Sequence, residues 1–213
     1  MEPTCFWYVK TIMPMTFALI AALAAHSADQ KPLVCAVMTD NAVNSRASGI
    51  EYAGVKYTFC CGMCPSAFTR NPAKYVKAAE EGDIVVGTSL FDPVSGARVD
   101  IKTAKFSSDF HGCRYFFSVN EDKSAFDAAP AKFTKTPDKE SLVCAMSGEK
   151  IADYGSSAGY ADYDGVRYYA CCSDCLPAMK KDLTALKTSK AVISTPKAIM
   201  GKNNEAMKMG GGK

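Results

Sequence analysis

The 213-residue sequence predicts an α+β fold made of three small tandem units of the treble-clef or zinc-ribbon type, each a β-hairpin followed by a helix. Three observations lead to this fold class. A pattern of glycine, aromatic and cysteine residues occurs twice, with a degenerate copy between the two occurrences. In each copy, two short aromatic and β-branched runs flank a dipeptide such as Ala-Gly or Asp-Gly, which is typical of a hairpin turn. A turn that carries the cysteines and then a helix follow the hairpin in both cysteine-bearing copies.

The first 28 residues are predicted to be a secretory signal peptide and not part of the fold. After Lys10 comes the uncharged apolar run TIMPMTFALIAALAA, and small residues follow up to Ala28, which is the order of a signal peptide. This run is shorter than the roughly 20 apolar residues that a membrane span needs. We therefore expect an exported protein, periplasmic or secreted; the alternative is an uncleaved N-terminal segment that anchors it to the membrane.

The first unit, residues 29–81, is predicted to contain a hairpin over GIEYAGVKYTF and then two helices. Pro65 suits the first position of a helix. Asn71-Pro72 has the residue types of an N-cap and a first helical residue, for a second helix that extends to about Glu81. The cysteine cluster therefore lies between a strand and a helix start, where backbone N–H groups lower the pKa of thiols and favour thiolates.

The third unit, residues 140–186, repeats the first, whereas the middle unit, residues 84–134, keeps the scaffold without the cysteine cluster. With Gly54 aligned on Gly165, YTFCCGMC matches YYACCSDC, and the middle unit has YFFSVNED at this place. The cluster is therefore dispensable for the fold, and we interpret it as the functional part of two units. In the middle unit the cysteine positions are occupied by Asp92, Ser118, Val119 and Asp122.

Each cysteine-bearing unit offers four thiols, which we interpret as ligands of a transition metal ion, copper or zinc. Tetrahedral Zn²⁺ prefers four sulfurs and Cu(I) is satisfied with two or three, so three and four ligands per site both stand. The only histidine after the predicted signal peptide, His111, is interpreted as a solvated turn residue because its own unit lacks the thiols. The candidate ligands are Cys35, Cys60, Cys61, Cys64, Cys144, Cys171, Cys172 and Cys175.

Two other interpretations of these cysteines stay open. Export usually brings a protein into an oxidising compartment, where the thiols would form structural disulfides of an envelope protein-interaction module. CGMC and CSDC at helix starts also fit the Cys-x-x-Cys pair of a thiol-disulfide oxidoreductase, although the strand-helix alternation of a thioredoxin fold is missing. No paired acid and base or activated nucleophile recurs in the units, so we expect no enzymatic activity.

The last segment, residues 187–213, is predicted to be a basic flexible tail. The whole chain has a formal net charge of +3, and this segment holds six lysines and one glutamate. Aromatic residues do not alternate with the lysines, so we expect no nucleic-acid binding. The expected partners are the metal ion and an envelope metal transporter or another partner protein.

The three units resemble one known family. DPVSGARV followed by GCRYFF, SAF and AAPAKF in the middle unit resembles a YHS domain. CAVMTD with YAGVKYTFCCGMCPSAFTRNPAKYV is similar to the related TRASH type, and CAMSGE with YDGVRYYACCSDC looks like a divergent copy of it. The resemblance covers residues 33–183.

This resemblance implies metal binding of the kind proposed for heavy-metal sensing, transport and resistance proteins. It implies a lone cysteine and a pair separated by three residues as ligands, with the cysteine inside each pair as a fourth ligand or a spare. It also implies that the middle unit binds no soft metal and has a structural or pairing role. By position the implied ligands are Cys35, Cys60 and Cys64 in one unit and Cys144, Cys171 and Cys175 in the other; the inner cysteines are Cys61 and Cys172.

Overall fold

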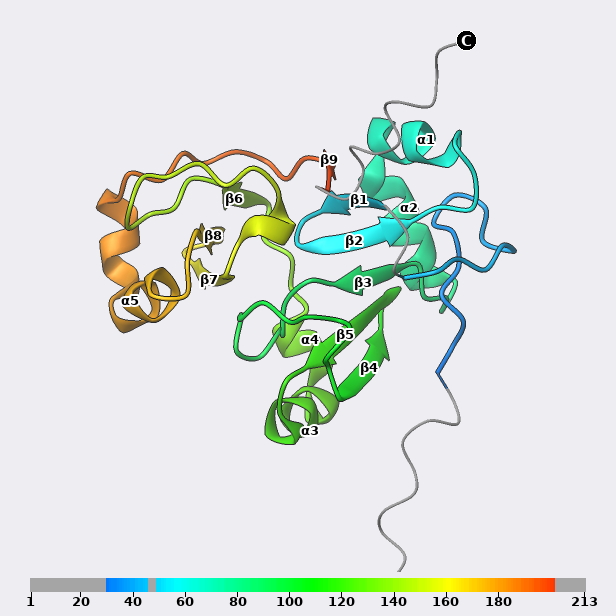
Figure 1. Ribbon diagram of the computed structural model, residues 1–213, viewed down its shortest axis with the longest axis horizontal. Helices are drawn as coiled ribbons and strands as arrows, with labels where there is room; N and C mark the ends of the chain where they lie inside the picture. The colour runs from blue at the N-terminus through cyan, green and yellow to red at the C-terminus, as the bar shows by residue number, and fades with distance from the viewer. Residues whose placement is uncertain (1–29, 46–48, 202–213) are drawn as a thin grey trace, which may run out of the picture. The chain divides into compact units, whose positions relative to one another are not determined.

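The computed structural model describes residues 30–45 and 49–201. The predicted signal peptide and the end of the predicted tail lie outside these residues. The described part contains sheets with hairpins and several helices, which confirms the α+β class (Figure 1). In the same residues, no helix combines the length and the apolar character that a bilayer crossing requires.

The described strands form two sheets. The larger sheet has the strand order β4-β5-β3-β2-β1-β9, and the smaller has the order β6-β8-β7. The strands are β1 Gly49–Tyr52, β2 Val55–Thr58, β3 Gly87–Ser89, β4 Phe106–Phe110, β5 Cys113–Phe117, β6 Lys139–Ser141, β7 Gly159–Tyr163, β8 Val166–Ala170 and β9 Ile199–Met200. The helices are α1 Cys64–Arg70, α2 Pro72–Glu81, α3 Asn120–Ala128, α4 Pro130–Phe133 and α5 Cys175–Lys181, with 3-10 turns η1 Tyr154–Ser156 and η2 Leu183–Thr188.

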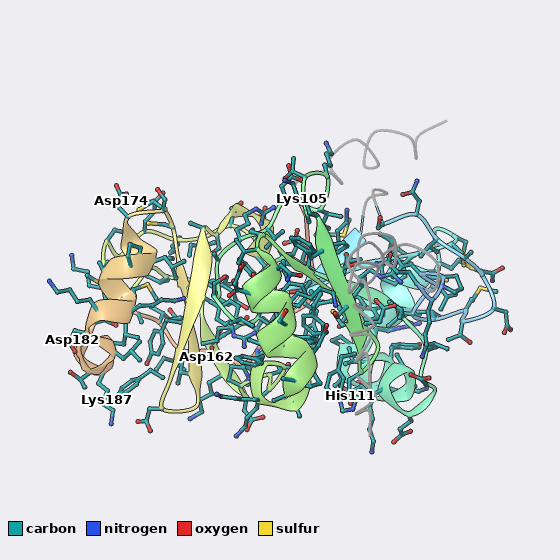
Figure 2. All side chains as sticks on the ribbon, turned by 90° about the horizontal axis from the view of Figure 1, so that it is seen from below. Lys105, His111, Asp162, Asp174, Asp182 and Lys187 are labelled. Carbon is teal, nitrogen blue, oxygen red and sulfur yellow. The ribbon has the colours of Figure 1, made fainter. Side chains whose placement is uncertain are left out.

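Each predicted unit has its hairpin, and the three hairpins share one turn geometry. Both turn residues have positive φ in every case, as a two-residue type I′ turn requires. Figure 2 shows His111 at the tip of the β4–β5 hairpin, which confirms its interpretation as a turn residue. The turns are Ala53-Gly54 with φ of 51° and 81°, His111-Gly112 with 44° and 78°, and Asp164-Gly165 with 51° and 75°.

The hairpins also repeat their cross-strand pairs. In the β4–β5 hairpin, Arg114 donates from Nε to Asp109 Oδ1 at 2.7 Å and from Nη2 to Asp109 Oδ2 at 2.8 Å. In the β7–β8 hairpin, Arg167 binds both oxygens of Asp162 in the same way, each at 2.8 Å. The sequence repeats are therefore structural repeats in register. The first hairpin places Glu51 opposite Lys56 at this position.

The helix signals of the first unit are confirmed. Pro65 lies in the first turn of α1. At the start of α2, Asn71 Oδ1 accepts a hydrogen bond from the N–H of Lys74 at 3.2 Å, and the helix ends at Glu81 as predicted. One residue at the same place in each unit fills the space between helix and hairpin: Phe68, Phe126 and Met179 are all essentially inaccessible to solvent.

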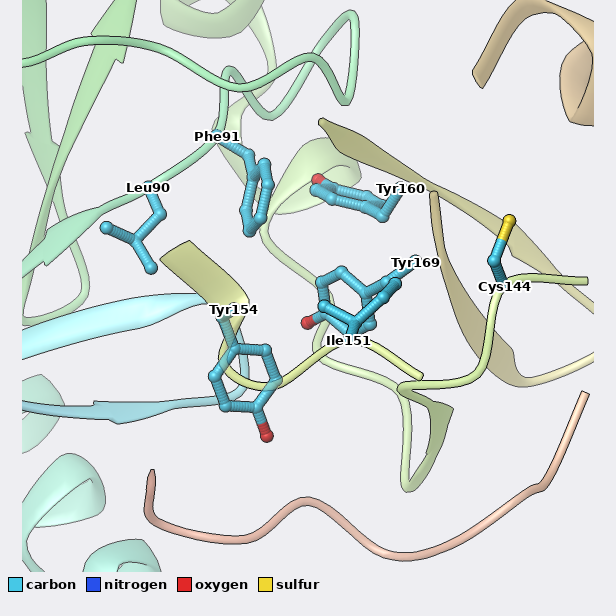
Figure 3. Packing of buried hydrophobic residues seen from close by; sticks show 7 residues of the cluster. All are labelled: Leu90, Phe91, Cys144, Ile151, Tyr154, Tyr160 and Tyr169. Atoms are coloured by element: carbon cyan, nitrogen blue, oxygen red, sulfur yellow. The ribbon is translucent and has the colours of Figure 1, made fainter. Parts of the chain in front are cut away.

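A shared aromatic cluster joins the middle and third units. Phe91 comes just before Asp92, which corresponds to the lone cysteine of the other units. Its ring lies 5.5 Å from that of Tyr160 and 5.7 Å from that of Tyr169. Figure 3 shows these three rings together, with the hydroxyl of Tyr154 pointing away from them. That hydroxyl donates to Glu140 Oε1 at 2.5 Å. The cluster consists of Leu90, Phe91, Cys144, Ile151, Tyr154, Tyr160 and Tyr169.

The predicted flexible tail differs from the structure over residues 187–201. Strand β9 pairs with β1 in this segment, and Ser194 exchanges two backbone hydrogen bonds of 2.8 Å with Glu140. The unpaired edges of β1 and β6 supply backbone donors and acceptors that a passing segment can satisfy. Lysine content does not report such backbone pairing, which explains the difference.

Candidate metal centres

The first candidate site consists of Cys35, Cys60 and Cys64, whose sulfurs all lie within 4.8 Å of one another. Cys60 follows strand β2, and Cys64 is the first residue of α1. The Sγ atoms of Cys60 and Cys64 are 3.8 Å apart. A tetrahedral ion with Zn–S bonds of about 2.3 Å places two sulfurs about 3.8 Å apart. The spacing of this pair therefore fits two ligands of one metal ion.

The second candidate site repeats the first in the third unit. Cys144, Cys171 and Cys175 also have sulfurs within 4.8 Å of one another. Cys171 follows strand β8, Cys175 begins α5, and their Sγ atoms are 3.7 Å apart. Cys144 lies at the edge of the aromatic cluster (Figure 3). Two separate segments of sequence thus produce the same sulfur triad from the same three positions of a unit.

A tight turn presents each lone cysteine to its pair. The N–H of Cys144 donates to the carbonyl of Glu149 at 2.9 Å, and Gly148 donates back to the carbonyl of Cys144 at 2.8 Å. In the first site, the N–H of Cys35 donates to Asn41 at 2.9 Å. Both lone cysteines are fully buried, so their sulfurs face the interior of the site.

The inner cysteines lie beside the triads and not within them. Cys61 Sγ is 3.3 Å from Cys64 Sγ, and Cys172 Sγ is 3.0 Å from Cys175 Sγ. Both residues are exposed to solvent. The structure therefore brings three of the four predicted thiols of each unit into a compact set and places the fourth against one member of it. All the cysteines in the described residues are free thiols.

The pKa of each lone cysteine is lowered, which favours the thiolate form. Burial raises the pKa of Cys144, but hydrogen bonds from the N–H groups of Cys171 and Ser147 and from the Ser147 hydroxyl outweigh burial and lower that pKa to about 6. Burial likewise raises the pKa of Cys35, and backbone N–H groups, that of Cys60 foremost, outweigh it, so the pKa of Cys35 is lowered. Hydrogen bonds to the charged form are the cause in both sites.

The cysteines in the first helical turn behave in the opposite way. Burial and then the neighbouring Cys61 sulfur raise the pKa of Cys64. The Cys172 sulfur and then burial raise the pKa of Cys175. The expectation that the helix start favours a thiolate is therefore wrong for these two residues, because burial and hydrogen bonds with neighbouring sulfurs both disfavour their charged form. It holds for Cys61 and Cys172, whose pKa values are lowered first by side-chain hydrogen bonds with Cys64 and Cys175, respectively, and then by backbone N–H groups. A cation that replaces the shared protons would offset the effect on Cys64 and Cys175.

The middle unit keeps the ligand scaffold but carries carboxylates. Asp92 makes the same turn as Cys144: its N–H donates to Ala97 at 2.9 Å, and Gly96 donates to its carbonyl at 2.7 Å. Asp92 is almost completely buried, and its Oδ2 has no hydrogen-bond partner among the described residues. Lys180 of α5 donates to the carbonyl of Ser95, and its charge interacts with Asp92 and Asp122. These ligand positions thus face an ammonium group from the third unit.

Sequence reasoning missed one position in each site. The residue three places after the lone cysteine contacts the first cysteine of the pair: Met38 Sδ is 3.8 Å from Cys60 Sγ, and Ser147 Oγ is 3.3 Å from Cys171 Sγ. The repeat alignment contains a signal for this position: with Cys35 aligned on Cys144, Met38 matches Ser147, and both residues carry a side chain that could bind a metal ion.

No protein-family model, no curated protein and no solved structure matches this chain. The informative comparison is internal. The first and third units each present three converging sulfurs, whereas the middle unit, with the same hairpin and turn, presents none at these positions.

Proposed function

We propose that the chain is an exported, non-enzymatic protein that binds a soft or borderline transition metal, copper or zinc, through cysteine thiolates. One observation carries the proposal: three sulfurs converge to within 4.8 Å at the same place in two repeated units. A purely structural need for these cysteines would apply to the middle unit as well, yet that unit keeps the hairpin, the turn and the helix without them.

The chemistry of the donors agrees with this proposal. Thiolates are soft ligands that favour Cu(I), Zn²⁺ and similar ions over Mg²⁺ or Ca²⁺. Each triad contains a buried lone cysteine whose pKa is lowered, so one ligand per site already favours the charged form. The resemblance of the units to YHS and TRASH domains adds weight, and it suggests sequestration, delivery or resistance as the role.

The setting of this activity follows from the sequence. The signal-peptide-like N-terminus favours a periplasmic or secreted protein that takes up the ion outside the cytoplasm. An envelope metal transporter or another partner protein would then exchange the ion with it. In this proposal, the middle unit serves as scaffold between two metal-binding units.

Native mass spectrometry of the reduced chain without its first 28 residues tests the proposal. We expect two ions of Cu(I) or Zn²⁺ per chain, lost again to a chelator. Replacing Cys35, Cys60 and Cys64 by serine should leave one ion. The control is Cys113→Ala, which removes a buried thiol outside both triads and should leave two. A chain that acquires no ion in the reduced state contradicts the proposal.

The second candidate function is a disulfide-stabilised interaction module. The short distances from Cys61 to Cys64, 3.3 Å, and from Cys172 to Cys175, 3.0 Å, favour it. In this case, protein isolated from its native compartment without reductant would lack one hydrogen per bridged cysteine and carry no metal. Recovery of the metal-bound, fully reduced form from that compartment would exclude it.

A further inference from the structure

The residue three places after the lone cysteine, or after Asp92 in the middle unit, has an equivalent position in all three units. The N–H of Met38 donates to Cys35 Sγ at 3.5 Å, and the N–H of Ser95 donates to Asp92 Oδ1 at 3.2 Å. In the third unit, the N–H of Ser147 is hydrogen-bonded to Cys144. Because the backbone is fixed in this way, the side chain of this residue begins at an equivalent point beside each ligand set.

In the first triad this side chain supplies a thioether. Met38 Sδ lies 3.8 Å from Cys60 Sγ, in the range of two ligands of one ion. The side chain is about half exposed, at 48%, although it is large and apolar. Packing therefore does not account for its position, and its unbranched side chain has the freedom to bring the sulfur onto a bound ion.

In the second triad the same place holds a hydroxyl. Ser147 Oγ lies 3.3 Å from Cys171 Sγ and accepts a hydrogen bond from the N–H of Glu149 at 3.2 Å. The oxygen is held beside the sulfurs by the turn itself. Oxygen is a harder donor than sulfur and suits Zn²⁺ better than Cu(I).

We infer that the two triads differ in metal preference: Met38 makes the first an all-sulfur site that favours Cu(I), and Ser147 makes the second a sulfur-and-oxygen site shifted toward Zn²⁺. This inference rests on the proposed function, because it presupposes that both triads bind metal. It assigns the two units different tasks, so that one chain holds two ions of different softness.

Single-site chains test this inference. Serine at the three cysteines of one triad leaves the other triad alone, and circular dichroism checks that the chain still folds. Anaerobic competition with a chromophoric Cu(I) chelator and with a Zn²⁺ chelator then gives the Cu(I):Zn²⁺ affinity ratio of each remaining site. We expect a higher ratio for the first site. Met38→Leu should lower it about 10-fold, and Ser147→Met should raise the ratio of the second site by a similar factor.

A matched control separates the role of Met38 from the presence of any nearby thioether. Met63 lies between the paired cysteines and is 80% exposed, so Met63→Leu should leave the ratio unchanged. X-ray absorption at the copper edge gives a second measurement, since Met38→Leu should remove one sulfur from the copper shell of the first site.

The outcomes distinguish this inference from the proposed function. Three outcomes would overturn the inference while leaving metal binding intact. These are equal ratios at the two sites, no effect of Met38→Leu on the ratio, and a copper shell that loses a sulfur in Cys61→Ser but not in Met38→Leu. Absence of metal binding by both single-site chains and by the parent chain overturns the proposed function itself.

Discussion

The second triad combines one acidic thiol with two thiols whose pKa values are raised. The pKa of Cys144 is lowered to about 6. The hydrogen bond with Ser147 lowers the pKa of Cys171, but burial and the nearby Cys144 sulfur together outweigh it, so this pKa is raised. The pKa of Cys175 is raised as well. A metal ion entering this site would therefore meet one thiolate and displace the protons of the other two. Its binding must depend on pH.

Zn²⁺ binding to the second triad is expected to release about two protons at pH 7, because Cys144 is already ionised there and Cys171 and Cys175 are not. The affinity should fall about 100-fold per pH unit below 7, and more steeply below pH 6, where Cys144 also binds a proton. Calorimetry of a chain lacking the first triad, in buffers of different ionisation enthalpy, counts the protons.

A second variant for this experiment is Ser147→Ala. It removes a hydroxyl that lowers the pKa of Cys144, so proton release at pH 7 should rise toward three. Proton release that is the same at pH 6 and pH 8 would contradict the assignment of the thiolate to Cys144.

The sequence predicts most of each triad, but not which of two adjacent cysteines belongs to it. The spacing of the cysteines predicts the triads, because the repeat fixes which positions converge. It does not separate Cys60 from Cys61, which are adjacent and chemically identical. Only the turn after β2 decides that Cys60 enters the triad and that Cys61 lies outside it, beside Cys64. Met38 was missed for the same reason, since its role depends on a side-chain direction.

At the scale of the elements, the hairpins and first-unit helices were predictable because their signals are local. A dipeptide that accepts positive φ and a proline after an N-cap determine structure over a few residues. Gly54 and Gly165 have φ of 81° and 75° and occupy the same turn position. Their surroundings differ. A Cβ on Gly54 would lie 3.3 Å from Phe91 and 3.2 Å from the Tyr169 hydroxyl, whereas a Cβ on Gly165 would have no atom within 4 Å.

Gly54→Ala is therefore expected to destabilise the protein more than Gly165→Ala. Both substitutions put a side chain at positive φ, which costs about 1 kcal/mol. Only Gly54→Ala also crowds the aromatic cluster, adding roughly 1–3 kcal/mol. Urea unfolding at equilibrium measures both changes in the free energy of unfolding. Equal losses would show that the cluster does not pack against the first hairpin, and metal stoichiometry should stay unchanged in both variants.

At the scale of the whole described chain, the assembly of the units was beyond sequence reasoning. Phe91 precedes Asp92 as Val143 precedes Cys144, so the repeat alignment treats the two residues as equivalent. In the structure Phe91 packs against rings of the third unit. The antiparallel pairing of β2 with β3 joins the first and middle units, and the return of β9 to β1 likewise joins segments that are distant in sequence. Periodicity indicates which side of an element is apolar and does not indicate which element covers it.

Besides the apolar contact of Phe91 with the third unit, Lys180 makes a polar contact between the third and middle units. Asp92 is buried, and burial followed by interaction with Asp122 raises its pKa. Lys180 extends from α5 of the third unit, donates to Ser95 and interacts with both carboxyl groups. The positions that hold sulfur in the other units thus hold a carboxyl pair compensated by a lysine, so the middle unit uses its ligand scaffold to bind a neighbouring unit.

Lys180→Met is accordingly expected to destabilise the protein by roughly 1 kcal/mol at pH 7, and the loss should become smaller in an Asp92→Asn background. The sign of the pH dependence follows from Asp92. Its pKa is raised in the folded state, so protonated Asp92 stabilises the fold at low pH, and this stability is lost as the pH rises through that pKa. The loss caused by Lys180→Met should therefore shrink as the pH falls and Asp92 becomes neutral.

Urea unfolding from pH 4 to pH 8 measures this coupling, with Lys181→Met as the matched control on the same helix. Lys181 is exposed at the end of α5, so its substitution should change stability little at any pH. If Lys180→Met and Lys181→Met behaved alike, the carboxyl pair would not hold the third unit through α5. If instead only Lys180→Met loses stability, and only where Asp92 is charged, the ammonium compensates the carboxylates as a metal ion would compensate the thiolates of the other two units.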